Sequence, residues 1–273
     1  MAAAAACRYC GAELPAPLES YQPPVAACGR CGLYWLMQPP GDGGKPAAPP
    51  TSGSPDPTEP NRETEAELLK LRGSLPDFPP GASVLDVGSA DGAWLASLAR
   101  SGYAAHGIEP SERLVEVGRA RGIDGLHAGR FDAKGIPPAL RDRTFDLISF
   151  RESLYYMSDL GACFELVRKL LNPHGKLYIK SHVADSAYYG ECRDYTSRYG
   201  SHVQAMPTLR AMEFVLNREG FRLRHWRNLE FTYLNDLGSS VPARAIRKAG
   251  ARLLARARSA QADRIAVVAE KNS

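Results

Sequence analysis

The sequence lacks the features that would hold the chain in a membrane or direct it out of the cell. No apolar run in its 273 residues reaches the roughly 18 residues that a membrane-spanning helix needs. The opening MAAAAA has neither a charged start nor a long apolar stretch, so we expect no signal peptide. A cytoplasmic protein is therefore predicted. Its six cysteines should be reduced, which favours metal binding over disulfides wherever cysteines occur in pairs.

A strong charge of either sign is also missing. The 34 Lys and Arg residues nearly balance the 30 Asp and Glu residues, which leaves a net charge of +4. The excess gathers near the C-terminus, where residues 241–273 carry eight basic side chains against two acidic ones. This distribution disfavours a protein that binds nucleic acid over its whole surface.

Composition divides the chain into three zones. Residues 1–37 hold four of the six cysteines, and residues 38–62 hold eight of the 21 prolines with almost no large apolar side chain, which predicts a linker. Over residues 63–273, apolar strands alternate with amphipathic helices. This alternation predicts an α/β domain with a mainly parallel sheet covered on both faces. We expect a helical insert at about residues 230–262, because Val241–Ala260 has a basic helical pattern.

The most informative stretch is VLDVGSADG, residues 84–92. An apolar strand leads to an acidic residue and then to two glycines around a tight turn, where the backbone can approach a ligand closely. The G-x-G-x-x-G spacing of dinucleotide-binding turns is absent. Asp86 would repel a pyrophosphate but suits a ligand with an ammonium group, such as S-adenosylmethionine. Glu109 closes the next strand, where a carboxylate can accept hydrogen bonds from both ribose hydroxyls.

This turn, the acidic end at GIEP and the segment LNPHGKLYI resemble class I S-adenosylmethionine-dependent methyltransferases over about Glu63–Lys271. The resemblance implies a doubly wound, Rossmann-like sheet of seven strands with a terminal antiparallel hairpin. Ala90 stands where the family usually has a glycine. The resemblance also implies that Asp132 lies near the adenine, with Phe131 beside the ring. The expected cofactor-binding residues are Asp86, Gly88, Ser89, Gly92, Glu109, Pro110, Phe131, Asp132 and Arg151.

Two C-x-x-C pairs near the N-terminus predict a metal site. Cys7 and Cys10 are separated by 17 residues from Cys28 and Cys31, a spacing typical of a zinc ribbon whose four sulfurs hold a structural Zn²⁺. A module of this size has little core, so the metal would supply its folding energy. A ribbon followed by a methyltransferase domain resembles a bacterial group that modifies small molecules such as sugars and natural-product intermediates.

The acceptor should bind beyond the carboxyl ends of the fourth and fifth strands. After the fifth strand, His182 is the expected general base, with a structural histidine as the alternative. After the fourth strand, Tyr155 and Tyr156 could line the acceptor pocket, assist proton transfer or simply pack. The Asn/Asp-Pro-Pro-Tyr/Phe motif of nitrogen methyltransferases is absent there. A later loop with Tyr188, Tyr189 and Tyr195 could cover the acceptor.

These features predict methyl transfer to oxygen or carbon of a small-molecule acceptor. One alternative is an RNA methyltransferase, in which the zinc module and the basic insert helix grip phosphates. Against it, that helix lacks the interleaved aromatic residues that stack on bases. A second alternative is a non-catalytic module that binds S-adenosylmethionine. The sequence does not indicate the oligomeric state.

Overall fold

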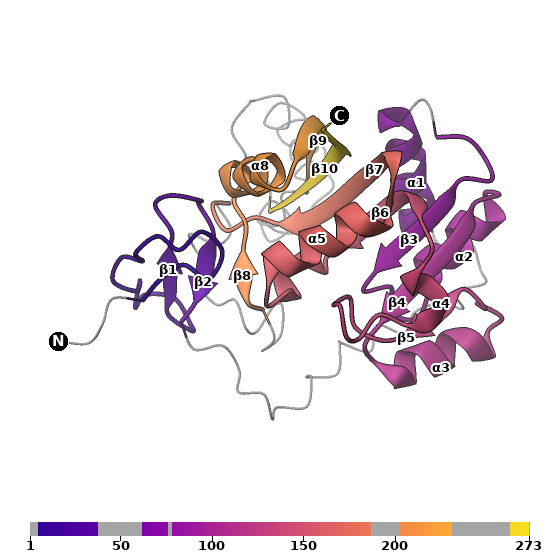
Figure 1. The fold of residues 1–273 in the computed structure, drawn as a ribbon, viewed down its shortest axis with the longest axis horizontal. Helices are drawn as coiled ribbons and strands as arrows, with labels where there is room; N and C mark the ends of the chain where they lie inside the picture. The colour runs from indigo at the N-terminus through magenta and orange to yellow at the C-terminus, as the bar shows by residue number, and fades with distance from the viewer. Residues whose placement is uncertain (1–4, 38–61, 76–77, 187–202, 231–262, 273) are drawn as a thin grey trace, which may run out of the picture.

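The computed structural model describes residues 5–37, 62–75, 78–186, 203–230 and 263–272, which form two β-sheets (Figure 1). The larger sheet has seven strands in the order β5-β4-β3-β6-β7-β10-β9, and the smaller has three in the order β1-β2-β8. Several expectations lie outside the described residues, namely most of the linker, the helix over 241–260, Cys192 and the loop tyrosines Tyr188, Tyr189 and Tyr195.

The seven-stranded sheet confirms the predicted doubly wound fold. Strand β3 pairs in parallel with β4 and β6, β4 with β5, and β6 with β7, whereas β10 runs antiparallel to both β7 and β9. The central strands read as nearly continuous apolar runs because helices bury them on both faces. The bounds are Ser83–Val87 for β3, Ala104–Glu109 for β4, Leu126–Ala128 for β5, Phe145–Arg151 for β6, Leu171–His182 for β7, Phe221–Glu230 for β9 and Arg264–Lys271 for β10.

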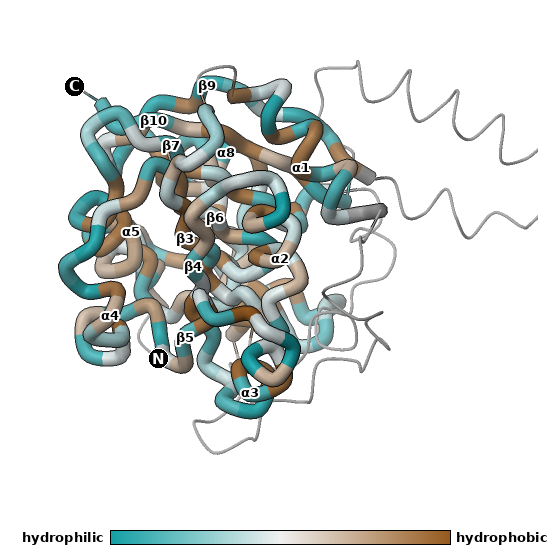
Figure 2. Tube along the Cα trace, turned by 90° about the vertical axis from the view of Figure 1, so that its right-hand side faces the viewer, coloured by the Kyte–Doolittle hydropathy of each residue, from teal (hydrophilic) through white to brown (hydrophobic). Residues whose placement is uncertain are grey.

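Helices cover the two faces of this sheet with separate apolar clusters. One cluster packs against α1 (Arg62–Ser74), α2 (Ala93–Arg100) and α3 (Glu112–Ala120). The other packs against α4 (Pro138–Arg141), α5 (Leu160–Leu170) and α8 (Leu209–Arg218). In Figure 2, hydrophobic residues of β3 lie in the middle of the domain, whereas hydrophilic residues follow the outer turns of α3.

Hydroxyl side chains cap the N-termini of helices α3 and α8. Ser111 caps the start of α3 and accepts a hydrogen bond from the backbone N–H of Leu114, at 3.4 Å. Thr208 likewise accepts from the N–H of Ala211 at the start of α8, at 2.9 Å. These caps satisfy backbone donors that the first helical turn leaves without partners.

The N-terminal module is built on a small antiparallel sheet of β1 (Val25–Ala27) and β2 (Tyr34–Leu36). Its third strand, β8 (Ala205–Met206), comes from the larger domain and pairs with β2. Figure 1 shows the module beside β8 and α8. No helix in the described part of the chain is long and apolar enough to cross a membrane.

Candidate functional site

The turn after β3 has left-handed backbone at three of its five positions. The φ angles are 77° at Gly88, 50° at Ala90 and 81° at Gly92. A Cβ atom on Gly88 would lie 2.6 Å from the Cβ of Ser153, so this position needs glycine for its space as well as for its φ angle. Ala90 occupies the left-handed region without that freedom, which costs about 1–2 kcal/mol.

Asp86 lies at the carboxyl end of β3 and is almost fully buried, with 1% of its surface exposed. Its Oδ1 accepts a hydrogen bond of 2.5 Å from Oγ of Ser149 on the neighbouring strand β6. Burial raises the pKa of Asp86 to about 6, although the positive charge of Arg151 and the Ser149 hydrogen bond both favour the carboxylate. A bound cation would stabilise the ionised form further. Ser149, a polar residue in an apolar strand, could have been found in the sequence by that contrast.

Glu109 lies at the carboxyl end of β4 and ties that strand to the turn. Its Oε2 accepts the N–H of Ala90 and its Oε1 accepts the N–H of Ser111, both at 3.0 Å. Burial raises the pKa of Glu109. Each carboxylate oxygen keeps a further lone pair, which could accept a ligand hydroxyl. Nearby, the buried Oγ of Ser89 has no hydrogen-bond partner among the described residues. These oxygens fit a ligand with hydroxyl and ammonium donors, as S-adenosylmethionine has.

The residues expected near the adenine, Phe131 and Asp132, contact other parts of the protein. Phe131 is buried and meets Phe150 edge to face, with 5.6 Å between the ring centroids. Oδ1 of Asp132 accepts hydrogen bonds from the N–H groups of Gly135 and Lys134, at 2.6 and 3.0 Å. These two bonds stabilise the loop that contains Asp132. Pro110 is exposed beside Glu109.

Arg151, one of the expected cofactor-binding residues, is held by helix α1. Its guanidinium donates two hydrogen bonds to Glu67, at 2.9 and 3.0 Å, and lies over the ring of Trp94. Burial opposes ionisation of Glu67, but Arg151 and Lys180 outweigh it and lower the pKa of Glu67 to about 2. The sequence does not single out Glu67, because it is one of three glutamates on this helix and charged residues of a short helix are usually solvated.

The carboxyl ends of β6 and β7 bring the three predicted catalytic residues together. The ring of Tyr155 lies 4.6 Å from that of Tyr156 and 6.1 Å from that of His182. Buried His182 has its Nε2 3.0 Å from Nε of Arg264 and 3.1 Å from Oε2 of Glu152.

Glu152 has an unusual backbone conformation, with φ at 59°, and also pairs with Arg264 at 3.3 Å. Burial raises the pKa of its carboxyl group. Left-handed backbone at a non-glycine residue often marks a functional site. We therefore add Glu152 and Arg264 to the candidate site.

The four cysteines of the N-terminal module form one buried cluster. Their sulfurs all lie within 4.8 Å of one another, with 3.6 Å between Cys7 and Cys31 and 3.5 Å between Cys10 and Cys28. Four sulfurs at about 2.3 Å around Zn²⁺ are separated by roughly 3.8 Å, so the cluster fits a tetrahedral zinc ion. Nε1 of Trp35 donates a hydrogen bond of 3.1 Å to the Cys7 sulfur, as outer residues of thiolate sites do.

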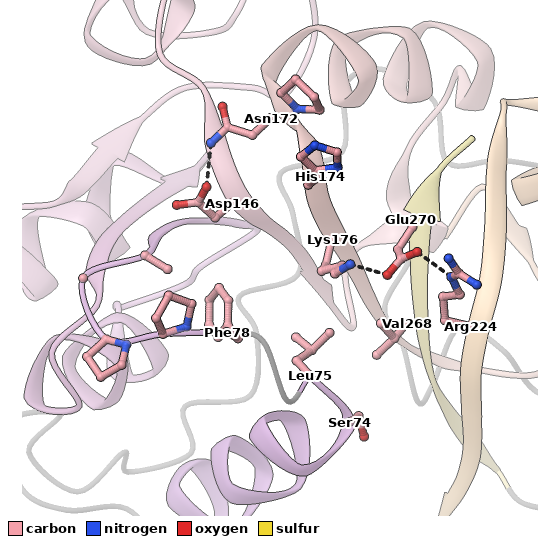
Figure 3. A pocket seen from close by; sticks show the side chains of 15 residues that line it. Ser74, Leu75, Phe78, Asp146, Asn172, His174, Lys176, Arg224, Val268 and Glu270 are labelled. Atoms are coloured by element: carbon pink, nitrogen blue, oxygen red, sulfur yellow. Dashed lines mark hydrogen bonds and ion pairs between the residues drawn. The ribbon is translucent and has the colours of Figure 1, made fainter. Parts of the chain in front are cut away.

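A hollow of about 740 Å³ lies at the opposite edge of the large sheet, where β3 begins and β10 ends (Figure 3). Glu270 pairs there with both Lys176 and Arg224. Phe78 contributes to its apolar lining. Because this hollow lies at the far ends of the strands from Asp86 and His182, it is separate from the candidate site.

Comparison with known proteins finds a matching family and similar structures. The family described as "Methyltransferase domain" matches residues 61–249. The ubiquinone biosynthesis O-methyltransferase of Xanthomonas oryzae pv. oryzae (strain PXO99A) is 30% identical over 103 residues, which are 37% of this chain and 43% of that protein. The match thus spans less than half of that relative's length.

Solved structures of S-adenosylmethionine-dependent methyltransferases share the fold. The protein from Mesorhizobium loti has a TM-score of 0.54 at 22% identity, covering 76% of this chain and 98% of its own. The protein from Archaeoglobus fulgidus has a TM-score of 0.55 at 19% identity, covering 76% and 94% respectively. At these identities, the likeness is one of fold.

Proposed function

The chain belongs to the methyltransferase domain family and has the fold of S-adenosylmethionine-dependent methyltransferases, and from this premise we propose that it methylates a small-molecule acceptor at oxygen. The observation that carries the proposal is the pair of buried carboxylates, Asp86 and Glu109, at adjacent strand ends around a left-handed turn. The name of the Xanthomonas relative supports oxygen as the methylated atom. Transfer to carbon remains the alternative acceptor chemistry.

At the donor end, each carboxylate has a separate role. Glu109 would accept hydrogen bonds from the ribose hydroxyls, since its oxygens are already aligned by two backbone N–H groups. Asp86 would favour the ammonium group by charge. When bound, S-adenosylmethionine supplies a methyl group on a positively charged sulfur, and that sulfur keeps the bonding electron pair as the methyl group leaves.

At the acceptor end, the proposed chemistry is removal of a proton. As a hydroxyl oxygen forms its bond to the methyl carbon, the hydroxyl proton must pass to a base, and Nε2 of His182 is our candidate. Glu152, 3.1 Å from that nitrogen, would stabilise the protonated ring. Arg264 now donates to the same nitrogen, so its guanidinium must move aside before His182 can take the proton.

We further propose that the cysteine cluster binds one structural Zn²⁺. Four sulfur ligands leave no open coordination position for substrate or water, which favours a structural over a catalytic metal. All four cysteines are buried, and the sulfur separations match tetrahedral geometry.

Transfer of label from methyl-labelled S-adenosylmethionine tests the acceptor class. The full-length protein is incubated with host small-molecule extract and, separately, with total RNA, with Glu109→Ala as the matched inactive control. Label in a small molecule supports the proposal, and the position of the new methyl group in its NMR spectrum separates oxygen from carbon. Label in RNA would contradict it. Cofactor binding without label in either fraction would favour the non-catalytic alternative.

A further inference from the structure

The small sheet joins the N-terminal module to the catalytic domain through backbone pairing. Tyr34 of β2 lies opposite Met206 of β8, and the N–H of Leu36 donates to the carbonyl of Gln204 at 3.3 Å. Because β8 belongs to the larger domain, the module is not a separate unit attached by a linker alone. Its sheet is completed by the catalytic domain (Figure 1).

The segment that contains β8 also forms backbone hydrogen bonds with the acceptor end of the candidate site. The N–H of Gln204 donates to the carbonyl of Tyr155 at 2.9 Å, and the N–H of Ala184, just after β7, donates to the carbonyl of Pro207 at 2.8 Å. Side chains from the module and from the catalytic domain also pack together beside these hydrogen bonds. One buried cluster combines Val25 and Leu36 of the module with Tyr155, Ala184, Val203 and Met206.

Both cysteine pairs contact the catalytic domain directly. Between the first two cysteines, the hydroxyl of Tyr9 donates to Oε1 of Glu219 at 2.8 Å, just after α8. After the last cysteine, the carbonyl of Gly32 accepts from the hydroxyl of Thr208 at 3.3 Å. A Cβ atom on Gly32 would lie 3.1 Å from that hydroxyl oxygen. The shape of the two turns, which a bound metal would fix, therefore sets how the module sits on α8.

The two carboxylates of the donor end have a different set of partners, whereas the backbone of the donor turn also accepts a hydrogen bond, from the Ser153 hydroxyl to the Val87 carbonyl. In the described part of the chain, the carboxylates of Asp86 and Glu109 accept hydrogen bonds from Ser149, Ala90 and Ser111, and none of these residues belongs to the module. A change in the module would therefore act first on Tyr155 and on the strand end at Ala184.

We infer that the metal-loaded module is a positioning element for the acceptor. Through β8 it holds the turn η1 (Leu154–Tyr156) in place, so metal loss loosens the acceptor end and leaves the donor end intact. This inference rests on the proposed function in two respects: the assignment of this end to the acceptor and the binding of Zn²⁺ by the cysteine cluster. The residues involved act through backbone and packing, so they are positioning residues rather than catalytic ones.

Hydrogen exchange of the full-length protein before and after chelation of the metal tests the inference. We expect peptides covering residues 153–157 and 203–207 to exchange at least about tenfold faster without metal. The Gln204 amide would lose its bond to the Tyr155 carbonyl, and the amides of Tyr156 and Met157 belong to the turn that this bond holds in place. Peptides covering residues 107–111 should keep their protection. Calorimetric affinity for S-adenosylmethionine should change by less than about threefold, a small fraction of a typical binding free energy.

Two outcomes would overturn the inference. In one, residues 153–157 stay protected while residues 25–36 of the module exchange freely. In the other, affinity for S-adenosylmethionine falls together with the acceptor-end protection, which indicates general unfolding. Failure of the metal-loaded protein to bind S-adenosylmethionine would instead contradict the proposed function. The exchange comparison would still test whether the metal supports residues 153–157.

A second variant separates the joint from the metal site. Met206→Ala keeps all four cysteines, so metal content should stay at the wild-type level while residues 153–157 lose protection. Leu98→Ala is the matched control, since it shortens a buried side chain on α2 at the other face of the sheet. Equal exchange at residues 153–157 in the two variants would show that Met206 has no special role there.

Discussion

Burial raises the pKa of Asp86 to about 6, so near neutral pH this carboxylate is ionised in surroundings that favour its neutral form. A cationic ligand relieves that conflict, and the ligand should therefore bind the ionised form preferentially. A low dielectric strengthens the attraction between the two charges relative to water. This electrostatic argument supports the proposal that the ammonium group binds at Asp86.

We expect the affinity for S-adenosylmethionine to depend on pH through Asp86. Below a pH of about 6, binding must first remove the proton, so affinity should rise by up to about tenfold per pH unit and level off above that value. Calorimetry from about pH 5 to about pH 8 measures this profile. Asp86→Asn should bind weakly with a flat profile, whereas the exposed Asp124→Asn should keep the wild-type curve. An unchanged curve in Asp86→Asn would remove this residue from the site.

Ala90 offers a test of backbone strain at the same turn. Ala90→Gly relieves a left-handed φ of 50° but adds entropy to the unfolded chain, so we expect a net stabilisation of about 0.5–1 kcal/mol. Denaturant unfolding measures it. The control Ala93→Gly, on helix α2, should instead lower the unfolding free energy by about 1 kcal/mol. Equal destabilisation by both changes would contradict strain at position 90.

At the scale of the elements, helix α1 is attached to the large sheet by a buried ionic network as well as by its buried leucine side chains. Glu67 accepts from Arg151, from the Tyr178 hydroxyl at 3.1 Å and from Lys180 at 3.1 Å. Arg151 and Lys180 are largely buried, and Glu67 accepts hydrogen bonds from both of them. Helix α1 is therefore positioned by the strand ends that also form the candidate site.

Loss of that carboxylate should be costly. Glu67→Gln removes the carboxylate that hydrogen-bonds both buried cations, so we expect the unfolding free energy to fall by about 3 kcal/mol in urea titrations. The exposed neighbour Glu65→Gln should stay within about 0.5 kcal/mol of the wild type. If the two substitutions had the same effect, the network would contribute little to stability.

Elements with a clear periodic pattern were predictable, and those defined by distant partners were not. The large sheet and its helices follow from alternating apolar runs, and the turn at Gly88 follows from its own residues. Strand β8 has two residues and no pattern of its own, because its partner lies about 170 positions earlier in the chain. Arg264 reads as an ordinary strand residue until the fold brings it against His182.

For the whole molecule, metal content is the simplest test of the proposed zinc site. We expect about one zinc per chain by elemental analysis, since the four thiolates form one tetrahedral set. Cys10→Ser should lose most of the metal. Cys163→Ser, at a buried cysteine on α5 outside the cluster, should keep it. A folded, metal-free wild-type protein would contradict a structural zinc.

The position of β8 in the chain has a consequence for synthesis on the ribosome. The module's own residues emerge first, but the strand that completes its sheet follows about 170 residues later. At typical rates of translation, this interval is roughly 10–35 s. The module is therefore made before the methyltransferase domain but completed only after most of that domain has been made. Until β8 has been made, the module exposes the edge of β2. Metal binding during this interval would shield its cysteines.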